Sequence, residues 1–336
     1  MTYEMFREIV IQRIKMYLPE EWKDAEISRI QYEKVNHFKE AIQFLRPLRE
    51  GEERVLAPNF SVYSFFQRYQ QGEELDEILR EIAQQVIEAD KTIDPVRDAL
   101  DMEEIKDKIV FELINTEQNK KYLENIPHRK YHDLSIIYTW LVGSDENGTL
   151  TATVTNSLME TLGFDEEIMF DVAKENMKEQ MPTVIKPMRE IIDELLGDAC
   201  GNEPLDFELE QENLMYVITN SRKYRGASAI LDEEKLHKFA ETLGEDFYLL
   251  PSSRHEFIAV PVSVGDKNML EEMVYEINQT QVELEDRLSN EVYQYDRQTR
   301  EIKQVTNSPH KRLDGRMSEA DLAYEKECRE KSRAGR

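Results

Sequence analysis

Four polar side chains of the types used in nucleophilic catalysis lie close together in the last third of the sequence. Ser252 and Ser253 offer hydroxyl nucleophiles. His255 offers a base and Glu256 an orienting acid, which completes the set used in acyl transfer. In an extended segment Ser253 and His255 point to one face and Glu256 to the other, so one strand alone cannot build the relay. With no Gly-x-Ser-x-Gly elbow in the sequence, the pattern favours a turn whose polar groups satisfy the backbone, with a hydrolase site as the alternative.

Apolar segments on both sides of this cluster predict strands and one helix. Residues 214–220 and 226–231 have the pattern of a buried strand and its return partner. Residues 247–250 and 257–260 have the pattern of a second strand pair, with the polar cluster between them. Between the two pairs, apolar residues spaced three and four apart predict a helix over residues 232–244.

Two further sets of polar residues could bind a ligand or a metal ion. Asn220 and Arg225 follow the first of these strands, and a sheet would bring them near the cluster as candidate binding residues. His128 and His132 are four apart with Asp133 adjacent, which on a helix would present two imidazoles to a metal ion. The flanking proline and apolar run predict a turn into a strand instead, where the two histidines lie about 13 Å apart. We therefore predict no metal site.

No other motif in the sequence indicates a cofactor. It contains no Walker loop, dinucleotide glycine fingerprint, HExxH pair or EF-hand spacing, and its 12 glycines supply few backbone-lined phosphate sites. The prediction is a protein without a cofactor.

Composition indicates a soluble globular protein. Of 336 residues, 40% are hydrophobic and 33% are charged. No apolar run reaches the roughly 18 residues of a membrane helix, and the N-terminus lacks signal-peptide features. Cys200 and Cys328 are far apart in sequence, which excludes a disulfide framework and fits a reducing compartment. We expect a cytoplasmic protein without membrane association.

The charge of the chain limits its partners. The formal net charge is −26, although residues 297–336 hold eleven Lys and Arg against seven Asp and Glu. An acidic protein repels nucleic acid backbones, so direct nucleic acid binding is not expected. Acidic side chains in a regular array could instead imitate a phosphate backbone, which leaves an acidic nucleic-acid mimic as an alternative hypothesis.

The order of the segments predicts an α+β fold. We predict that one strand-strand-helix unit is used about four times, forming antiparallel sheets with helices packed on one face in two or three lobes. The predicted divisions are an N-terminal α+β lobe (1–95), a middle α+β lobe (96–196), a linker (197–204), a C-terminal α+β lobe (205–295) and a mobile, mildly basic tail (296–336).

Other elements are predicted from the helical spacing and the strand alternation of apolar residues. Helices are predicted over residues 3–18, 75–87, 165–177 and 269–288. Strands are predicted over residues 25–34, 41–45, 134–142 and 150–155. The Asn147-Gly148 step favours a tight hairpin between the last two strands.

Several segments of the chain resemble a known family. They are Lys108–Asn115, Ile126–His128, Asp133–Ile137, Tyr216–Asn220, Arg225–Ala227, Gly244–Tyr248 and Leu249–Ser253 with His255-Glu256. The family resembled is one of uncharacterised bacterial proteins from anaerobic gut organisms, often found near mobile elements, and the resemblance covers residues 1–295. The pattern around residues 214–261 is also similar to the YtpQ-type proteins. Neither resemblance implies an activity.

These observations support one leading functional hypothesis and two alternatives. Because the sequence has no established catalytic motif, the leading hypothesis is a non-enzymatic cytoplasmic protein-interaction module, linked to mobile elements or host defence. Its partner is expected to be a protein. The alternatives are a hydrolase that uses Ser252, Ser253, His255 and Glu256, and the acidic nucleic-acid mimic.

Overall fold

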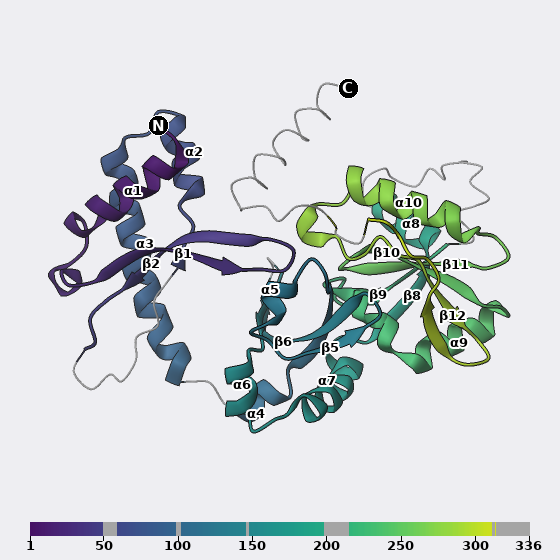
Figure 1. Cartoon of the computed structure of the whole chain (residues 1–336). Coiled ribbons are helices and arrows are strands. Elements are labelled where there is room, and N and C mark those ends of the chain that lie inside the picture. Colours follow the sequence, from purple (N-terminus) through teal and green to yellow (C-terminus); the bar gives the residue numbers. More distant parts are fainter. Residues whose placement is uncertain (50–58, 99–101, 146–147, 198–214, 311–312, 314–336) are drawn as a thin grey trace. The chain divides into compact units, whose positions relative to one another are not determined.

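The computed structural model describes residues 1–49, 59–98, 102–145, 148–197, 215–310 and 313. The chain divides into two compact units, one within Met1–Asp101 and the other within Met102–Gly315 (Figure 1). The described strands pair in antiparallel fashion and helices pack against the sheets they form. The predicted α+β class is therefore confirmed.

The first unit combines α-helices with a three-stranded sheet. Its described elements are α1 (Tyr3–Arg13), β1 (Glu26–Glu33), β2 (Phe38–Leu45), β3 (Asn59–Phe60), α2 (Tyr63–Gln70) and α3 (Leu75–Asp98), with strand order β1-β2-β3. Phe6, Phe44 and Ile82 contribute to one buried cluster, because each apolar stripe faces the same interior. The predicted helix over residues 3–18 ends its α-helical part at Arg13 and continues as a short 3₁₀ turn.

A four-stranded sheet begins the second unit. Its strands are β4 (Ile109–Asn115), β5 (His128–Tyr131), β6 (Leu134–Asp145) and β7 (Gly148–Thr153), and its helices are α4 (Met102–Lys106), α5 (Lys120–Leu123), α6 (Asn156–Thr161) and α7 (Glu166–Gln180). β6 pairs with β4, β5 and β7. Asp145 lies opposite Gly148, as expected for the predicted hairpin, while residues 146 and 147 lie outside the described part.

A six-stranded sheet completes the second unit, in the order β13-β12-β10-β11-β9-β8. The strands are β8 (Thr183–Pro187), β9 (Tyr216–Asn220), β10 (Phe247–Ser253), β11 (Glu256–Pro261), β12 (Tyr293–Asp296) and β13 (Glu301–Gln304), and the helices are α8 (Met188–Gly197), α9 (Glu233–Leu243) and α10 (Lys267–Thr280). Alternate residues of β10 face opposite sides, so Leu249 packs with α9 and Leu250 packs with α10. The helix α10 thus lies on the sheet face opposite α9, a second layer that the prediction did not include (Figure 1).

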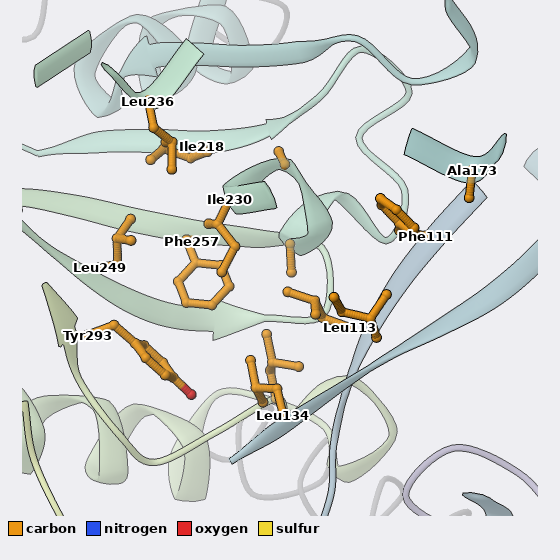
Figure 2. Packing of buried hydrophobic residues seen from close by; sticks show 14 of the residues in the cluster. Phe111, Leu113, Leu134, Ala173, Ile218, Ile230, Leu236, Leu249, Phe257 and Tyr293 are labelled. Atoms are coloured by element: carbon orange, nitrogen blue, oxygen red, sulfur yellow. The ribbon is translucent and has the colours of Figure 1, made fainter. Parts of the chain in front are cut away.

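One hydrophobic core joins the two sheets of this unit. Phe111 and Leu134 from the four-stranded sheet belong to the same buried cluster as Ile218, Leu249 and Phe257 from the six-stranded sheet (Figure 2). The segments predicted as separate lobes, 96–196 and 205–295, therefore share their interior. The predicted lobe boundaries stay predictions, because the chain between them lies mostly outside the described residues.

The segment predicted as a return strand after β9 is a 3₁₀ helix, η4 (Gly226–Leu231). The two edges of β9 are already used, by β8 and by β11, so the following segment has no free edge on which to pair. Its apolar residues are buried beneath the sheet, as Ala227, Ala229 and Ile230 all join the shared core. The pattern predicted burial correctly but assigned the wrong backbone conformation.

Two further predictions are corrected near the end of the described chain. The helix predicted over residues 269–288 is shorter, because α10 ends at Thr280 and the fully buried Arg287 turns inward, with Nε donating to the Val282 carbonyl at 3.0 Å. Residues 296–304, predicted to begin a mobile tail, form a β hairpin instead. Its turn is fixed by Asp296, whose carboxylate accepts hydrogen bonds from two backbone N–H groups at 2.9 Å each.

Other predictions fall on residues that the structure does not describe. Cys200, Cys328 and most of the predicted linker are among them. In the described part of the chain, no helix has both the length and the apolar character needed to cross a membrane.

Candidate functional site

The two candidate serines serve the turn between β10 and β11. The Ser252 hydroxyl donates to the Glu256 carboxylate at 3.4 Å. The Ser253 hydroxyl accepts the backbone N–H of His255 at 3.0 Å, next to a bulge that separates Pro251 from Ser253 in the strand pairing. The Ser253 hydroxyl thus satisfies a backbone group of the turn, whereas the Ser252 hydroxyl contacts a side chain.

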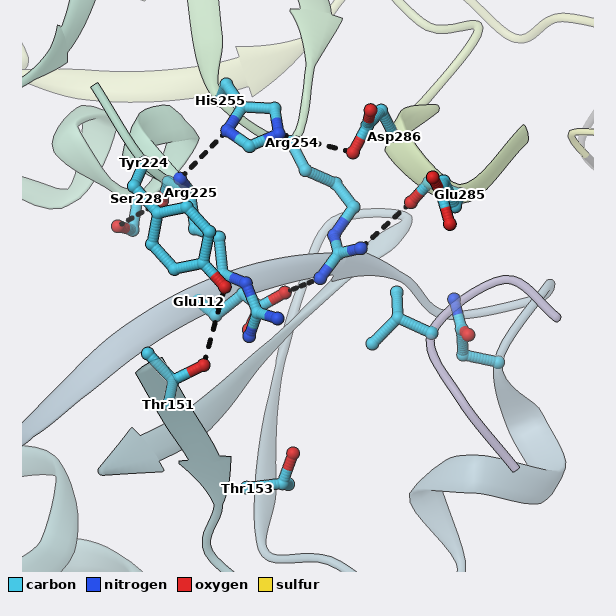
Figure 3. Close-up of polar contacts among 12 residues, drawn as sticks. Glu112, Thr151, Thr153, Tyr224, Arg225, Ser228, Arg254, His255, Glu285 and Asp286 are labelled. Carbon is cyan, nitrogen blue, oxygen red and sulfur yellow. Dashed lines mark hydrogen bonds and ion pairs between the residues drawn. The ribbon is translucent and has the colours of Figure 1, made fainter. Parts of the chain in front are cut away.

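The imidazole of His255 is held by two other partners (Figure 3). Its Nδ1 accepts the backbone N–H of Arg225 at 3.1 Å, so in the neutral ring Nε2 carries the proton. Nε2 lies 3.2 Å from the Asp286 carboxylate and donates to it. Burial by itself would raise the pKa of Asp286, but the hydrogen bond from His255 and the nearby positive charges, including those of Arg254 and Arg225, together lower that pKa. The described contacts therefore engage both ring nitrogens and bring neither candidate serine to the imidazole.

A buried carboxylate that the sequence analysis missed contacts Arg225, the hydrogen-bond partner of this histidine, and Arg254, its neighbour in sequence. Glu112, in the middle of β4, is fully buried and accepts from the guanidinium groups of Arg225 and Arg254 (Figure 3). Burial by itself would raise the pKa of Glu112, but the charges and hydrogen bonds of the two arginines hold that pKa below its ordinary value. A single acid within the apolar run of β4 was the available signal, since buried carboxylates in proteins are normally paired.

Arg254 extends the cluster to the segment after α10. Its Nη1 donates to the Glu285 carbonyl at 2.8 Å, and its backbone N–H donates to the Asp286 carbonyl at 2.8 Å. Its own carbonyl accepts the N–H of Ala227 at 3.2 Å. One arginine therefore links β4, the turn of β10 and β11, η4 and the segment that carries Asp286.

The other predicted binding residue, Asn220, shapes the loop that carries Arg225. Its side-chain oxygen accepts the N–H of Arg222 at 3.0 Å, and its amide nitrogen donates to the Tyr224 carbonyl at 2.9 Å. Arg225 then adopts a left-handed conformation with φ of 48°. Gly226 follows where no Cβ fits, because an added Cβ would lie 2.2 Å from the Thr219 hydroxyl oxygen.

This polar cluster is balanced in charge. The carboxylates of Glu112 and Asp286 match the guanidinium groups of Arg225 and Arg254, and each of these groups has an intrachain partner. These ion pairs join β4 to the six-stranded sheet, and the charged groups are neutralised by one another. The cluster therefore connects the four-stranded sheet to the six-stranded sheet.

The histidines weighed as metal ligands lie at the two ends of β5. His128 Nδ1 is 3.0 Å from the Ile126 carbonyl, and His132 adopts a left-handed conformation after the strand, with φ of 57°. The predicted extended segment is thus present, and the two residues are not on one helix face. Asp133 contacts Ser289 at 2.7 Å and the Tyr293 hydroxyl, so its carboxylate is used inside the fold.

Two cavities in the second unit are large enough to hold a ligand. The first, here named the methionine groove, has a volume of about 360 Å³ and is lined by Met188, Met215, Leu250, Ile258, Met273 and Ile277. Ser252 and Glu256 also face it. It lies between α8, α10 and the face of the sheet that α10 covers.

The second cavity, here named the aromatic cleft, has a volume of about 390 Å³. Phe111, Tyr131, Phe170, Tyr295, Lys174 and Arg300 line it. Both volumes fall within the range of sites that hold small molecules or single side-chain anchors of a partner. The sequence analysis predicted neither cavity, because each draws its residues from segments far apart in the chain.

Comparison with known proteins gives a family. Residues 3–297 match a family described as a family of unknown function, DUF5688. Neither the search of curated proteins nor that of solved structures gave a match. The family match spans nearly the same residues as the resemblance found in the sequence, and it brings no activity with it.

Proposed function

The chain belongs to a family of unknown function (DUF5688), and we propose that it acts as a non-catalytic protein-interaction module. In this proposal the methionine groove holds the apolar face of a basic amphipathic helix from a partner protein. The observation that carries the proposal is an apolar groove lined by methionines and bordered by acidic side chains.

The lining of the groove suits a helix with apolar anchors. Methionine side chains are flexible and polarisable, so they adapt to partners of varied shape. On α10, Met269, Met273 and Ile277 are four residues apart and form one stripe. Met269 is 72% exposed and Ile277 is 38% exposed, so the stripe continues the groove outward to solvent. Grooves of this kind accept helix faces with anchors at the same spacing.

The acidic side chains around the groove favour a basic partner helix. Glu256 lines the groove, and the exposed Glu272 and Glu276 lie on α10 beside the stripe. The chain as a whole carries a formal net charge of −26. A basic helix would therefore be attracted before contact and favoured after it, whereas an acidic helix would be repelled.

The internal pairing of the polar cluster supports the non-catalytic part of the proposal. His255 uses its two ring nitrogens on Arg225 and Asp286, so a hydrolase mechanism would first have to release it. Cytoplasmic location, a bacterial source, YtpQ likeness and a link to mobile elements or host defence stay predictions. The alternative hypothesis of an acidic nucleic-acid mimic also stays a prediction.

The test uses a synthetic peptide of leucine and lysine patterned as an amphipathic helix. A scrambled peptide of the same composition controls for charge alone. We expect the full chain to bind the patterned peptide more tightly, with affinity falling as salt is added. Ile277→Asp should weaken binding about tenfold or more, which corresponds to about 1.4 kcal/mol, because it places a charge on the apolar stripe.

The matched control is Ile168→Asp. Ile168 lies on α7, is 44% exposed and does not line the groove, so this variant should bind the peptide as the wild type does. Circular dichroism establishes that both variants fold. Equal binding of the scrambled peptide, or equal loss of affinity in the two variants, would contradict the proposal.

A further inference from the structure

We propose that the aromatic cleft is a second binding site, which takes a small aromatic monoanion such as an arenecarboxylate. The site is separate from the methionine groove, because the two cavities share no lining residue. It therefore adds a small-molecule ligand to a protein whose other groove is proposed to bind a helix.

Aromatic side chains form the apolar part of the cleft. The rings of Phe111 and Phe170 lie 5.0 Å apart, and Tyr131 and Tyr295 line the same cavity. Flat apolar rings favour a flat apolar ligand, which can stack on or pack edge to face against them. The volume of about 390 Å³ is large enough for one small molecule.

The charges in the cleft favour a single negative charge on the ligand. The guanidinium of Arg129 is already held by Glu166 at 2.7 Å and Glu167 at 2.9 Å. Lys130, Lys174 and Arg300 line the cleft and make no ion pair with the part of the chain that the structure describes. Glu233 and Glu301 also line it, so a ligand with several negative charges would be repelled.

One side chain in the wall of the cleft has a buried, unpaired hydroxyl. Tyr295 is 1% exposed and its ring stacks on Phe247 with centroids 5.0 Å apart. Its hydroxyl is buried and has no hydrogen-bond partner among the described residues. Buried polar groups are seldom left unpaired in folded proteins. Because Tyr295 lines the cleft, a small shift of its ring would let a ligand carboxylate accept a hydrogen bond from this hydroxyl.

The cleft also has room for a substituent on the ring. A smaller cavity of about 110 Å³ shares Phe111, Lys174, Leu231 and Glu233 with the cleft. The shared residues make the two cavities neighbours. A substituent on the ligand ring is therefore expected to point toward the smaller cavity.

The test is calorimetric titration of the full chain with 2-naphthoate, with neutral 2-naphthamide as the matched ligand. We expect 2-naphthoate to bind at least tenfold more tightly. Tyr295→Phe should weaken 2-naphthoate binding about tenfold without lowering the melting temperature, since the lost hydroxyl has no partner in the described fold. Lys174→Met should weaken 2-naphthoate but leave 2-naphthamide unchanged.

Two variants locate the bound probe. Lys235→Met removes an exposed lysine that lines neither cavity and should change nothing. Ile277→Asp alters only the methionine groove and should also leave 2-naphthoate binding intact. Absence of binding, equal binding of the two ligands, or a loss caused by Ile277→Asp and not by Tyr295→Phe would overturn the proposal.

Discussion

At the residue scale, Glu112 decides how the polar cluster is held. Replacing it with Gln leaves Arg225 and Arg254 in place without their shared carboxylate. Removing one partner of a buried ion pair costs about 3–5 kcal/mol, because the remaining charge is uncompensated. We expect Glu112→Gln to lower the free energy of unfolding by about that amount, measured by urea denaturation.

A matched exposed pair distinguishes this buried cluster from ordinary surface charge. Glu175 pairs with Lys178 at 2.9 Å on α7, and solvent screens that pair, so Glu175→Gln should change stability far less. If the two variants lost equal stability, the central role of Glu112 would be wrong.

The same carboxylate predicts a pH dependence. The pKa of Glu112 is lowered in the folded state, so the folded chain holds this carboxylate ionised more strongly than the unfolded chain does. Its stabilising contribution is full above the unfolded pKa of about 4.3 and is lost as the pH falls through the lower folded value. The difference in stability between wild type and Glu112→Gln should therefore shrink on acidification. A difference that stayed constant to low pH would contradict this assignment.

At the element scale, the close packing of η4 against β9 depends on Gly226. An added Cβ would meet the Thr219 hydroxyl oxygen at 2.2 Å and the His255 carbonyl oxygen at 2.6 Å. Crowding of this kind costs about 1–3 kcal/mol, so Gly226→Ala should lower the melting temperature.

A glycine with a different constraint gives the control. Gly163 has φ of 73° and no atom within 4 Å of an added Cβ, so Asn, which tolerates the left-handed region, should be accepted there. Asn at Gly226 should be as harmful as Ala or worse. Equal tolerance of Asn at both positions would show that η4 can shift away from the sheet.

The elements also show what could be predicted from the sequence. Periodicity located α9 and the β10–β11 pair, because each buries a stripe that is visible within about ten residues. It failed for η4, where the deciding fact is that β8 and β11 occupy the edges of β9. His255, Arg225 and Asn220 were found as candidates, but Glu112 was not, since its partner Arg225 is 113 positions away. Pairings over such distances leave no local pattern.

At the scale of the second unit, the shared core predicts how the chain unfolds. Phe111 and Leu134 pack in the same cluster as Leu249 and Phe257, and Glu112 bridges the same two sheets. We therefore predict one cooperative transition for residues 102–315. The predicted lobe of residues 205–295, even when extended to residue 310 to complete β13, should not fold by itself.

Two fragments test this prediction. Residues 102–315 should melt cooperatively, because both sheets and their common interior are present. Residues 205–310 expose the apolar surface that β4 and β6 cover, and they leave Arg225 and Arg254 without Glu112. Thermal melting followed by circular dichroism should then give a broad, featureless curve. A sharp transition in the shorter fragment would instead support the separate C-terminal lobe predicted from the sequence, with the contact between the sheets adding little to its stability.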